Sequence, residues 1–405
     1  MTVLESPQVL RSAGRGSFGG RKVIDVDTHL TEPHDLWTSR APASLMDRVP
    51  QVKMIDGQRS WVIDGNVIIG KGANPSSTVA ADGSKWPGLD FLSRSIEECH
   101  AASYSVRERV ELMDQIGIGA QIVYPNILGF GGQNTAKVSG ELREASIRIY
   151  NDAMAEMQAE SRGRIFPMAL LPWWDPKLAA AETRRAHGMG LRGININSDP
   201  HTHIGLDGQP LPDLGQPYWD ALWETCVELE MPVNFHIGAS DQSMDWFGSQ
   251  FWPGLPYELQ MGLGGAMMFI NNGRVMANLI YSGLLDRFEK LKFVSVESGI
   301  GWIPFILEAL DMQYRETGAR VQRLRRMPSE YFASNFLACF WFERKNLTTT
   351  IRQVGVDNVL FETDFPHPIC LYPIDDVDSA LEGLEEAEKV KILSGNAARI
   401  YKIDL

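Results

Sequence analysis

Four residues of the sequence combine the side-chain types and the spacing of a metal-binding site. Asp27 and His29 lie two residues apart in the strand-like segment KVIDVDTHL, so both side chains point to the same face. His236 ends a second such segment, PVNFHI, and Asp364 follows a third, NVLFET. Two imidazoles and two carboxylates suit Zn²⁺, Mn²⁺ or Fe²⁺. We therefore predict that these four residues bind one divalent metal ion, with zinc as the first expectation and manganese or iron as alternatives.

The segments that must position these residues alternate regularly between strand-like and helical patterns. Alternating strands and helices predict a parallel sheet with crossover helices, and eight such units are the number that closes a (β/α)₈ barrel. An open, doubly wound sheet is the alternative, but no GxGxxG motif follows the first strand. The predicted strands lie at 22–30, 120–124, 164–171, 191–197, 232–237, 291–297, 335–340 and 358–363.

Two stretches are longer than a barrel requires, and both follow the carboxyl ends of strands, where barrel enzymes build their active sites. Residues 31–105 follow strand one and include a predicted β-hairpin with turns at Asp56-Gly57 and Asp64-Gly65. Residues 239–264 follow strand five. Each insertion could be a lid or an oligomer contact. We expect the hairpin's apolar residues to be buried by a neighbouring chain: Val52, Met54, Trp61, Val62, Ile63, Val67 and Ile68.

Composition excludes several classes of protein. The 405 residues carry 38 basic and 51 acidic side chains, a net charge of −13, which does not indicate a nucleic-acid or anionic-membrane partner. There is no apolar run long enough to span a membrane and no CxxC pair. Residues 1–21 are expected to form a flexible or partner-docked arm, followed by a single barrel domain at 22–405. We expect a cytoplasmic homo- or hetero-oligomer.

Several motifs resemble the amidohydrolase-related family of metal-dependent barrels, which includes aminocarboxymuconate semialdehyde and resorcylate decarboxylases. They are VIDVDTHLTEP, VNFHIG, LKFVSVESGIGWIPF and LFETDFPHP, followed by KILSGNAARIY. The resemblance implies a distorted (β/α)₈ barrel with metal at the carboxyl ends of its strands. His236 and Asp364 match the family's His on strand five and Asp on strand eight. Asp27 stands where the family's HxH or ExH motif has its first ligand.

Glu297 stands where the family carries a His on strand six. Strand alternation places Glu297 on the same face as Phe293 and Ser295, at the carboxyl end of the strand beside His236. We expect it to act as a base towards metal-bound water. It could instead be a further ligand that bridges a second metal, or pair only with an arginine.

The residues and the resemblance together predict an enzyme that acts on a small organic molecule. The first expectation is metal-dependent hydrolysis or non-oxidative decarboxylation, with Glu297 and Asp364 as catalytic residues. The alternatives are an O₂-activating Fe or Mn monooxygenase of the same superfamily and a catalytically weak, metal-containing partner subunit. We expect His203, His367 and Trp174 to contact the substrate, because they follow predicted strands at the same end of the barrel.

Overall fold

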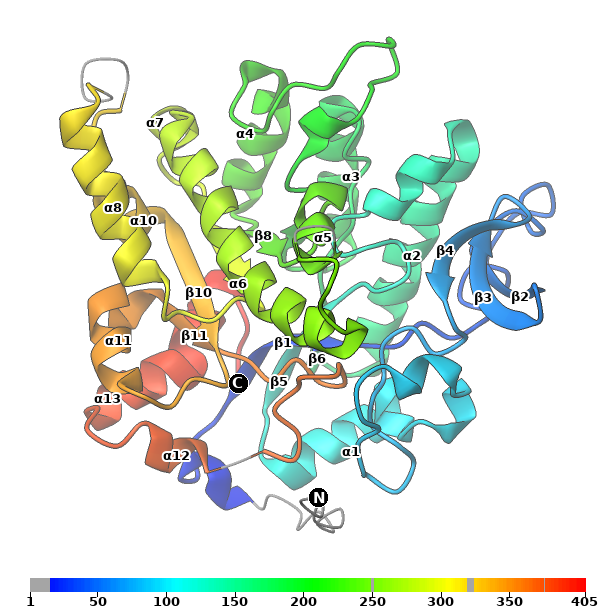
Figure 1. Ribbon diagram of the computed structural model, residues 1–405, viewed down its shortest axis with the longest axis horizontal. Helices are drawn as coiled ribbons and strands as arrows, with labels where there is room; N and C mark the ends of the chain where they lie inside the picture. The colour runs from blue at the N-terminus through cyan, green and yellow to red at the C-terminus, as the bar shows by residue number, and fades with distance from the viewer. Residues whose placement is uncertain (1–14, 249–250, 319–323, 375) are drawn as a thin grey trace.

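Eight strands that pair in parallel, together with their connecting helices, make up most of the computed structural model, which describes residues 15–248, 251–318, 324–374 and 376–405 (Figure 1). The strands are β1 (Ile24–His29), β5 (Ala120–Tyr124), β6 (Ile165–Pro167), β7 (Ile194–Asn195), β8 (Val233–His236), β9 (Phe293–Val296), β10 (Phe336–Phe340) and β11 (Val359–Phe361). The helices of at least eight residues are α1 (Val106–Ile116), α2 (Gly140–Glu160), α3 (Pro176–Gly188), α4 (Asp220–Leu229), α5 (Asp241–Gly248), α6 (Tyr257–Tyr281), α8 (Ile303–Glu316), α10 (Pro328–Asn335) and α11 (Leu347–Val354). Shorter helices are α7 (Leu284–Arg287), α12 (Val377–Ala380), α13 (Glu386–Val390) and α14 (Asn396–Tyr401).

The ring of strands closes through two single bridges. One sheet has the order β1-β5-β6 and the other the order β11-β10-β9-β8-β7. A parallel bridge between Ala169 and Ile194 joins the end of β6 to β7, and one between Thr28 and Phe365 joins β1 to the segment after β11. The predicted distorted (β/α)₈ barrel is therefore confirmed, and the distortion lies at these two seams.

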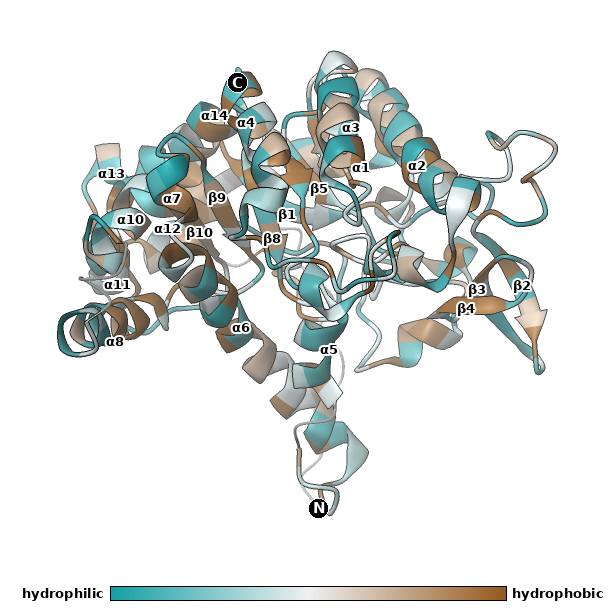
Figure 2. Ribbon diagram, turned by 90° about the horizontal axis from the view of Figure 1, so that it is seen from above, coloured by the Kyte–Doolittle hydropathy of each residue, from teal (hydrophilic) through white to brown (hydrophobic). Residues whose placement is uncertain are grey.

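Alternation along the strands divides the core into an inner and an outer part. Inside the ring, Ile24, Tyr124 and Val296 pack together. Outside it, Phe235 and Phe293 pack with the apolar faces of the helices. In Figure 2 the barrel strands are largely brown, while the helices around them carry both brown and teal. Because apolar side chains fill the ring and cover its outside, the polar side chains that can contact a ligand are those at the carboxyl ends of the strands.

The insertion after β1 folds as the predicted hairpin, with a third strand. β2 (Gln51–Ile55), β3 (Gln58–Ile63) and β4 (Val67–Lys71) pair antiparallel, and Asp56 and Gly57 both have positive φ, at 49° and 82°. This small sheet lies beside α2 at the edge of the molecule (Figure 1). The expected burial of Trp61, Val62 and Ile63 by a neighbouring chain is wrong, because all three are buried within this chain. Met54, Val67 and Ile68 are exposed.

The segment after β8 contributes α5 and the first turns of α6. Of the predicted N-terminal arm, residues 1–14 lie outside the described residues. The rest is fixed to the barrel: Phe18 is buried against Phe361, and Arg21 pairs with Asp378 at 2.7 Å. Within the described parts of the chain, no helix combines the length and the apolar character needed to cross a membrane.

Candidate functional site

A bulge in β1 turns Asp27 and His29 into the barrel. Asp25 pairs with Gln121 of β5, but the next pairs are Thr28 with Val123 and His29 with Tyr124, so β1 carries one extra residue. Ile24 already faces inward, and strict alternation would have turned His29 outward. The extra residue reverses the alternation and places His29 beside the inward-facing Tyr124.

Two other strand ends bring further predicted metal-binding side chains to the same place. His236 is the last residue of β8, and Asp364 follows β11 with a positive φ of 60°. Asp27 Oδ1 lies 3.5 Å from His29 Nε2 and 3.5 Å from His236 Nε2. Asp364 Oδ1 lies 3.6 Å from His29 Nε2. The structure therefore brings together all four of the predicted metal-binding residues, and each is buried.

The spacing and the unsatisfied atoms of this cluster fit a divalent cation. Two atoms that each lie about 2.1 Å from a tetrahedral ion are about 3.4 Å apart, close to the distances observed. Neither oxygen of Asp27 makes a well-formed hydrogen bond, nor does Nε2 of His236. His236 Nδ1 lies 2.9 Å from the carbonyl of Ile237, to which it donates, so Nε2 presents its lone pair to the cluster. Buried polar atoms without partners are costly unless a ligand satisfies them.

Glu297 reaches the cluster by a different route from the one that strand alternation predicts. The inward residues of β9 are Val294 and Val296, and Phe293 packs outside the ring. Glu297 follows β9 with a φ of 54°, and this left-handed backbone turns its side chain into the mouth of the barrel. Its Oε2 lies 3.5 Å from His236 Nε2. Its position beside His236 was predicted, whereas the backbone conformation that places it there was not.

A further carboxyl group, Glu362, lies inside the barrel and was missed. Glu362 Oε2 accepts a hydrogen bond of 3.2 Å from the backbone N–H of Glu297, while Oε1 has no well-formed partner. The sequence carries one signal for it, because Glu362 precedes Asp364 by two residues. Burial raises the pKa of Glu297, Glu362 and Asp364 well above their ordinary values, and neighbouring carboxylates raise it further. A bound cation would relieve this repulsion.

Burial and neighbouring charges also shift the pKa values of the imidazoles of His29 and His236. Burial lowers the pKa of His29 well below its ordinary value, and His367 and His236 lower it further. Burial also disfavours the charged form of His236, but Asp27 and Glu297 raise its pKa above the ordinary value. His29 is thus held in the neutral form that binds metal ions.

His367 links the cluster to two residues that follow β1 and β5. Its Nδ1 lies 3.0 Å from Asp364 Oδ1, and its Nε2 lies 3.0 Å from Asn126 Oδ1. The amide nitrogen of Asn126 donates to Glu32 Oε2 and to the carbonyl of Leu30, both at 3.0 Å. The amide oxygen of Asn126 must therefore face His367, which places a hydrogen on Nε2. The 3.0 Å contact between Nδ1 and Asp364 Oδ1 then requires a second proton between these two atoms.

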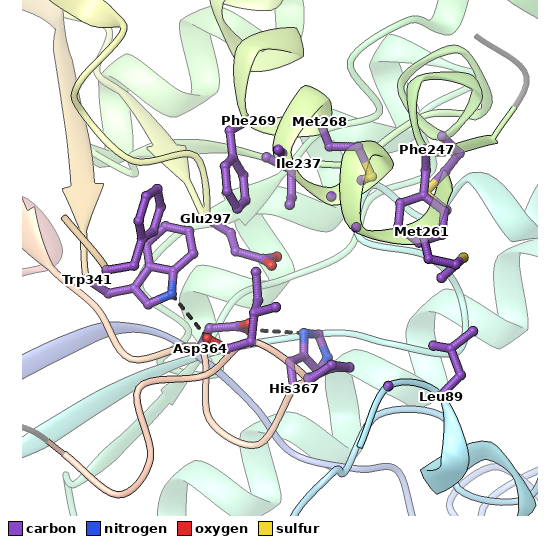
Figure 3. A pocket seen from close by; sticks show the side chains of 18 of the residues that line it. Leu89, Ile237, Phe247, Met261, Met268, Phe269, Glu297, Trp341, Asp364 and His367 are labelled. Atoms are coloured by element: carbon purple, nitrogen blue, oxygen red, sulfur yellow. Dashed lines mark hydrogen bonds and ion pairs between the residues drawn. The ribbon is translucent and has the colours of Figure 1, made fainter. Parts of the chain in front are cut away.

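A cavity of about 570 Å³ opens directly above these groups. Glu297, Asp364 and His367 point into it, and Met261, Phe269 and Trp341 surround it (Figure 3). Its large apolar lining residues are Leu89, Phe130, Ile237, Met244, Phe247, Met261, Met268, Phe269, Trp341, Phe342, Pro368 and Ile369. Segments after β1, β5, β8, β10 and β11 supply this wall, together with α5 and α6.

Two residues that were expected to contact the substrate lie elsewhere. His203 packs its ring 4.7 Å from that of Trp173, and its Nε2 lies 3.7 Å from Asp241 Oδ2. Trp174 is buried beneath the guanidinium of Arg143, which lies 3.8 Å from its ring centre. Neither is among the described residues that line the cavity, whereas His367 is. The loops after β6 and β7 fold against α2 and α5 instead of towards the mouth.

Comparison with known proteins agrees with this architecture. A γ-resorcylate decarboxylase of a Polaromonas species is 28% identical over 334 residues, which cover 79% of this chain and 91% of that protein. The solved structure of an amidohydrolase from Mycobacterium avium subsp. paratuberculosis matches with a TM-score of 0.74 and 24% identity, covering 94% of this chain and 99% of the other. A third match is a 5-carboxyvanillate decarboxylase from Novosphingobium aromaticivorans, which was solved with manganese and 4-hydroxy-3-methoxy-5-nitrobenzoic acid. Its TM-score is 0.61 at 18% identity, and the match covers 96% of this chain and 98% of that chain. That structure contains manganese, so the comparison does not support our expectation of zinc. The profile of the amidohydrolase family matches residues 24–403, and the chain therefore belongs to this family of enzymes.

Proposed function

We propose that this protein is a manganese-dependent decarboxylase that removes the carboxyl group of an aromatic acid as CO₂ without oxidation. The observation that carries the proposal is a buried group of possible ligand atoms, in which Asp27, His29 and His236 lie beside Glu297 and Asp364. Of these residues, Glu297 and Asp364 line the floor of an apolar cavity. The decarboxylase relative, which aligns over most of its length, supports this reaction over hydrolysis. A cavity with apolar walls suits an aromatic ring, and a metal ion at its floor suits a carboxylate.

Asp27, His29, His236 and Asp364 would hold the ion. When bound, a divalent ion supplies a Lewis acid that attracts the oxygens of an acidic substrate. Two carboxylates balance the charge of one divalent ion, and the ion would take the place of a proton on His236 Nε2. A third ionised carboxylate at the same point would leave an excess of negative charge in a buried site. Manganese is our first choice because the solved decarboxylase contains it, and zinc and iron remain alternatives.

Glu297 is our candidate for the proton carrier. In decarboxylation the carbon–carbon bond to the carboxylate breaks, CO₂ leaves, and the ring carbon takes up a proton in its place. Glu297 lines the cavity and its Oε2 lies 3.5 Å from His236 Nε2, so its carboxyl group adjoins both the proposed ligands and the space that we assign to the ring. Its carboxylic acid can donate the proton and recover it from solvent. In a hydrolytic reaction the same group would act as a base towards metal-bound water.

A second candidate function is O₂ activation by iron or manganese. The possible ligand atoms of His29, Glu297, Asp364 and His367 all lie within 4.8 Å of one another, as do those of Asp27, His29, His236 and Glu297. A site with two imidazoles and several carboxylates is also the ligand chemistry of non-haem iron enzymes. This candidate requires O₂ consumption, whereas decarboxylation proceeds equally well without O₂.

The test is to load protein from metal-free medium with Mn²⁺, Zn²⁺ or Fe²⁺ and to supply carboxyl-¹³C-labelled 2-hydroxybenzoate, 2,6-dihydroxybenzoate or 1-hydroxy-2-naphthoate in D₂O under argon. We expect one labelled CO₂ and one ring deuteron per product molecule, with Mn²⁺ present and with the wild-type chain only. The Asp27→Asn variant, which retains the side-chain volume, serves as the metal-deficient control. Turnover that requires O₂, or metal-loaded protein that releases no CO₂ from any of the acids, would contradict the proposal.

A further inference from the structure

The cavity above the proposed metal site is much larger than a single aromatic ring requires. An enclosed space of about 150 Å³ is enough to hold benzene. The volume here is about 570 Å³, nearly four times as large. A one-ring acid would leave most of this space to water, against walls that are almost entirely apolar.

The polar groups of the cavity are confined to its floor. Glu297, Asp364 and His367 lie there, and among the described residues that line the cavity none is Arg or Lys. A ring that carries several hydroxyl groups would lose their hydrogen bonds to water without finding new partners on these walls, which is unfavourable. An unsubstituted hydrocarbon body would instead gain from burial against them.

The wall formed by α6 combines small and flexible residues. Gly262 and Gly265 line the cavity, and a Cβ atom added at either position would meet no other atom within 4 Å. Met261 and Met268 stand on the same stretch of helix, and methionine adapts its unbranched side chain to irregular apolar shapes. The free space therefore lies along α6, opposite the floor of polar groups.

We infer that the substrate is an apolar carboxylic acid whose hydrocarbon body exceeds one ring, with two or more fused rings or an equivalent volume. Its carboxylate lies at the floor beside Glu297 and Asp364, and its body extends along α6 past Gly265. The placement of the carboxylate rests on the proposed decarboxylase function. The size and apolar character of the body rest on the cavity alone.

The test compares two acids with the same polar groups, 2-hydroxybenzoate and 1-hydroxy-2-naphthoate, which differ by one fused ring. Their dissociation constants from the Mn²⁺-loaded protein are measured by calorimetry, together with CO₂ release. We expect the two-ring acid to bind at least about tenfold more tightly, because the second ring removes additional apolar surface from water. Equal or weaker binding of the two-ring acid would overturn the inference, even if the one-ring acid releases CO₂. Tighter binding without CO₂ release from either acid would support the inference and contradict the proposed function.

Gly265→Leu provides a second readout within the same experiment. The new side chain enters the free space along α6, and replacing glycine by leucine favours the helix. We expect the affinity ratio between the two acids to fall at least tenfold while the manganese content stays the same. Gly188→Leu, at the exposed end of α3 where an added Cβ also meets no atom within 4 Å, is the matched control and should leave the ratio unchanged. An unchanged ratio in Gly265→Leu would contradict the placement of the substrate along α6.

Discussion

The backbone N–H of Asp364 donates a 2.8 Å hydrogen bond to the carbonyl of Asp27. This bond lies at the seam between β11 and β1, where the neighbouring Thr28–Phe365 bridge closes the barrel. The two proposed ligands with carboxylate side chains are therefore joined through their main chains as well. Metal binding at this point would hold the seam closed, and an empty site would leave two buried carboxylates facing each other across it.

Manganese should therefore stabilise the fold. A ligand that binds only the folded state at 100 times its dissociation constant adds about 2.7 kcal/mol to the free energy of unfolding. We expect this gain in urea unfolding of wild-type protein when Mn²⁺ is added after chelation. The Asp27→Asn variant should bind Mn²⁺ more than about 100-fold less tightly and show almost none of the gain. An equal gain in both proteins would mean that the ion binds elsewhere.

Replacing Glu297 separates its chemical role from metal binding. Glu297→Gln keeps the shape of the side chain but removes the proton that it could transfer. We expect the rate of CO₂ release to fall about 10²-fold to 10⁴-fold while the manganese content is retained. Glu156→Gln, on the exposed side of α2, is the control for the same chemical change. Loss of manganese from Glu297→Gln would make Glu297 a ligand, and an unchanged rate would remove it from the mechanism.

Asn126 should act as a positioning residue through His367. In Asn126→Ala the imidazole loses the acceptor that holds the hydrogen on Nε2, and its contact with Asp364 through Nδ1 is no longer fixed. We expect about a tenfold loss of kcat and a mixture of ring tautomers in ¹⁵N NMR spectra of histidine-labelled protein. Asn134→Ala, in the same loop, removes two amide hydrogen bonds to backbone carbonyls and should leave the His367 signal unchanged. A wild-type tautomer in Asn126→Ala would refute this role.

An ion pair between a partly exposed arginine and a buried aspartate connects the wall of the cavity to the barrel. Arg274 of α6 donates to both carboxylate oxygens of Asp199, which follows β7, at 2.7 and 2.8 Å. Ser240 Oγ donates to the same carboxylate at 2.5 Å. Arg274→Ala would leave a buried charge without its partner, and we expect a loss of about 3 kcal/mol in urea unfolding. The double variant Arg274→Ala/Asp199→Ala should recover part of this loss. If Arg274→Ala alone is as stable as wild type, the ion pair contributes nothing to stability.

The sequence predicted the elements of this protein better than their local irregularities. The eight strands and the Asp56-Gly57 turn follow from hydrophobic periodicity and from the preference of Asp-Gly pairs for positive φ. The meeting of Asp27 with His236 follows from their positions at strand ends in a closed barrel. These predictions depend only on regular geometry.

The features that the sequence did not predict arise where the regular geometry breaks. The extra residue in β1 and the left-handed backbone at Glu297 both redirect a side chain. The residue types at these two positions do not indicate either irregularity. His203 and Trp174 were misplaced because loop conformation depends on tertiary packing, here against Trp173 and Arg143. Asn126 was missed because its contacts with Glu32 and His367 join residues that are far apart in the sequence.

The most direct measurement of the central claim is the anomalous scattering of manganese in crystals of the Mn²⁺-loaded protein. The account predicts one strong peak at the carboxyl end of the barrel, about 2.0–2.2 Å from side-chain atoms of Asp27, His29, His236 and Asp364. Glu297 should stand beside the ion without bonding to it, facing the apolar cavity. A crystal soaked at saturating Mn²⁺ that shows no peak within reach of these four residues, or an ion bound elsewhere in the chain, would contradict the account.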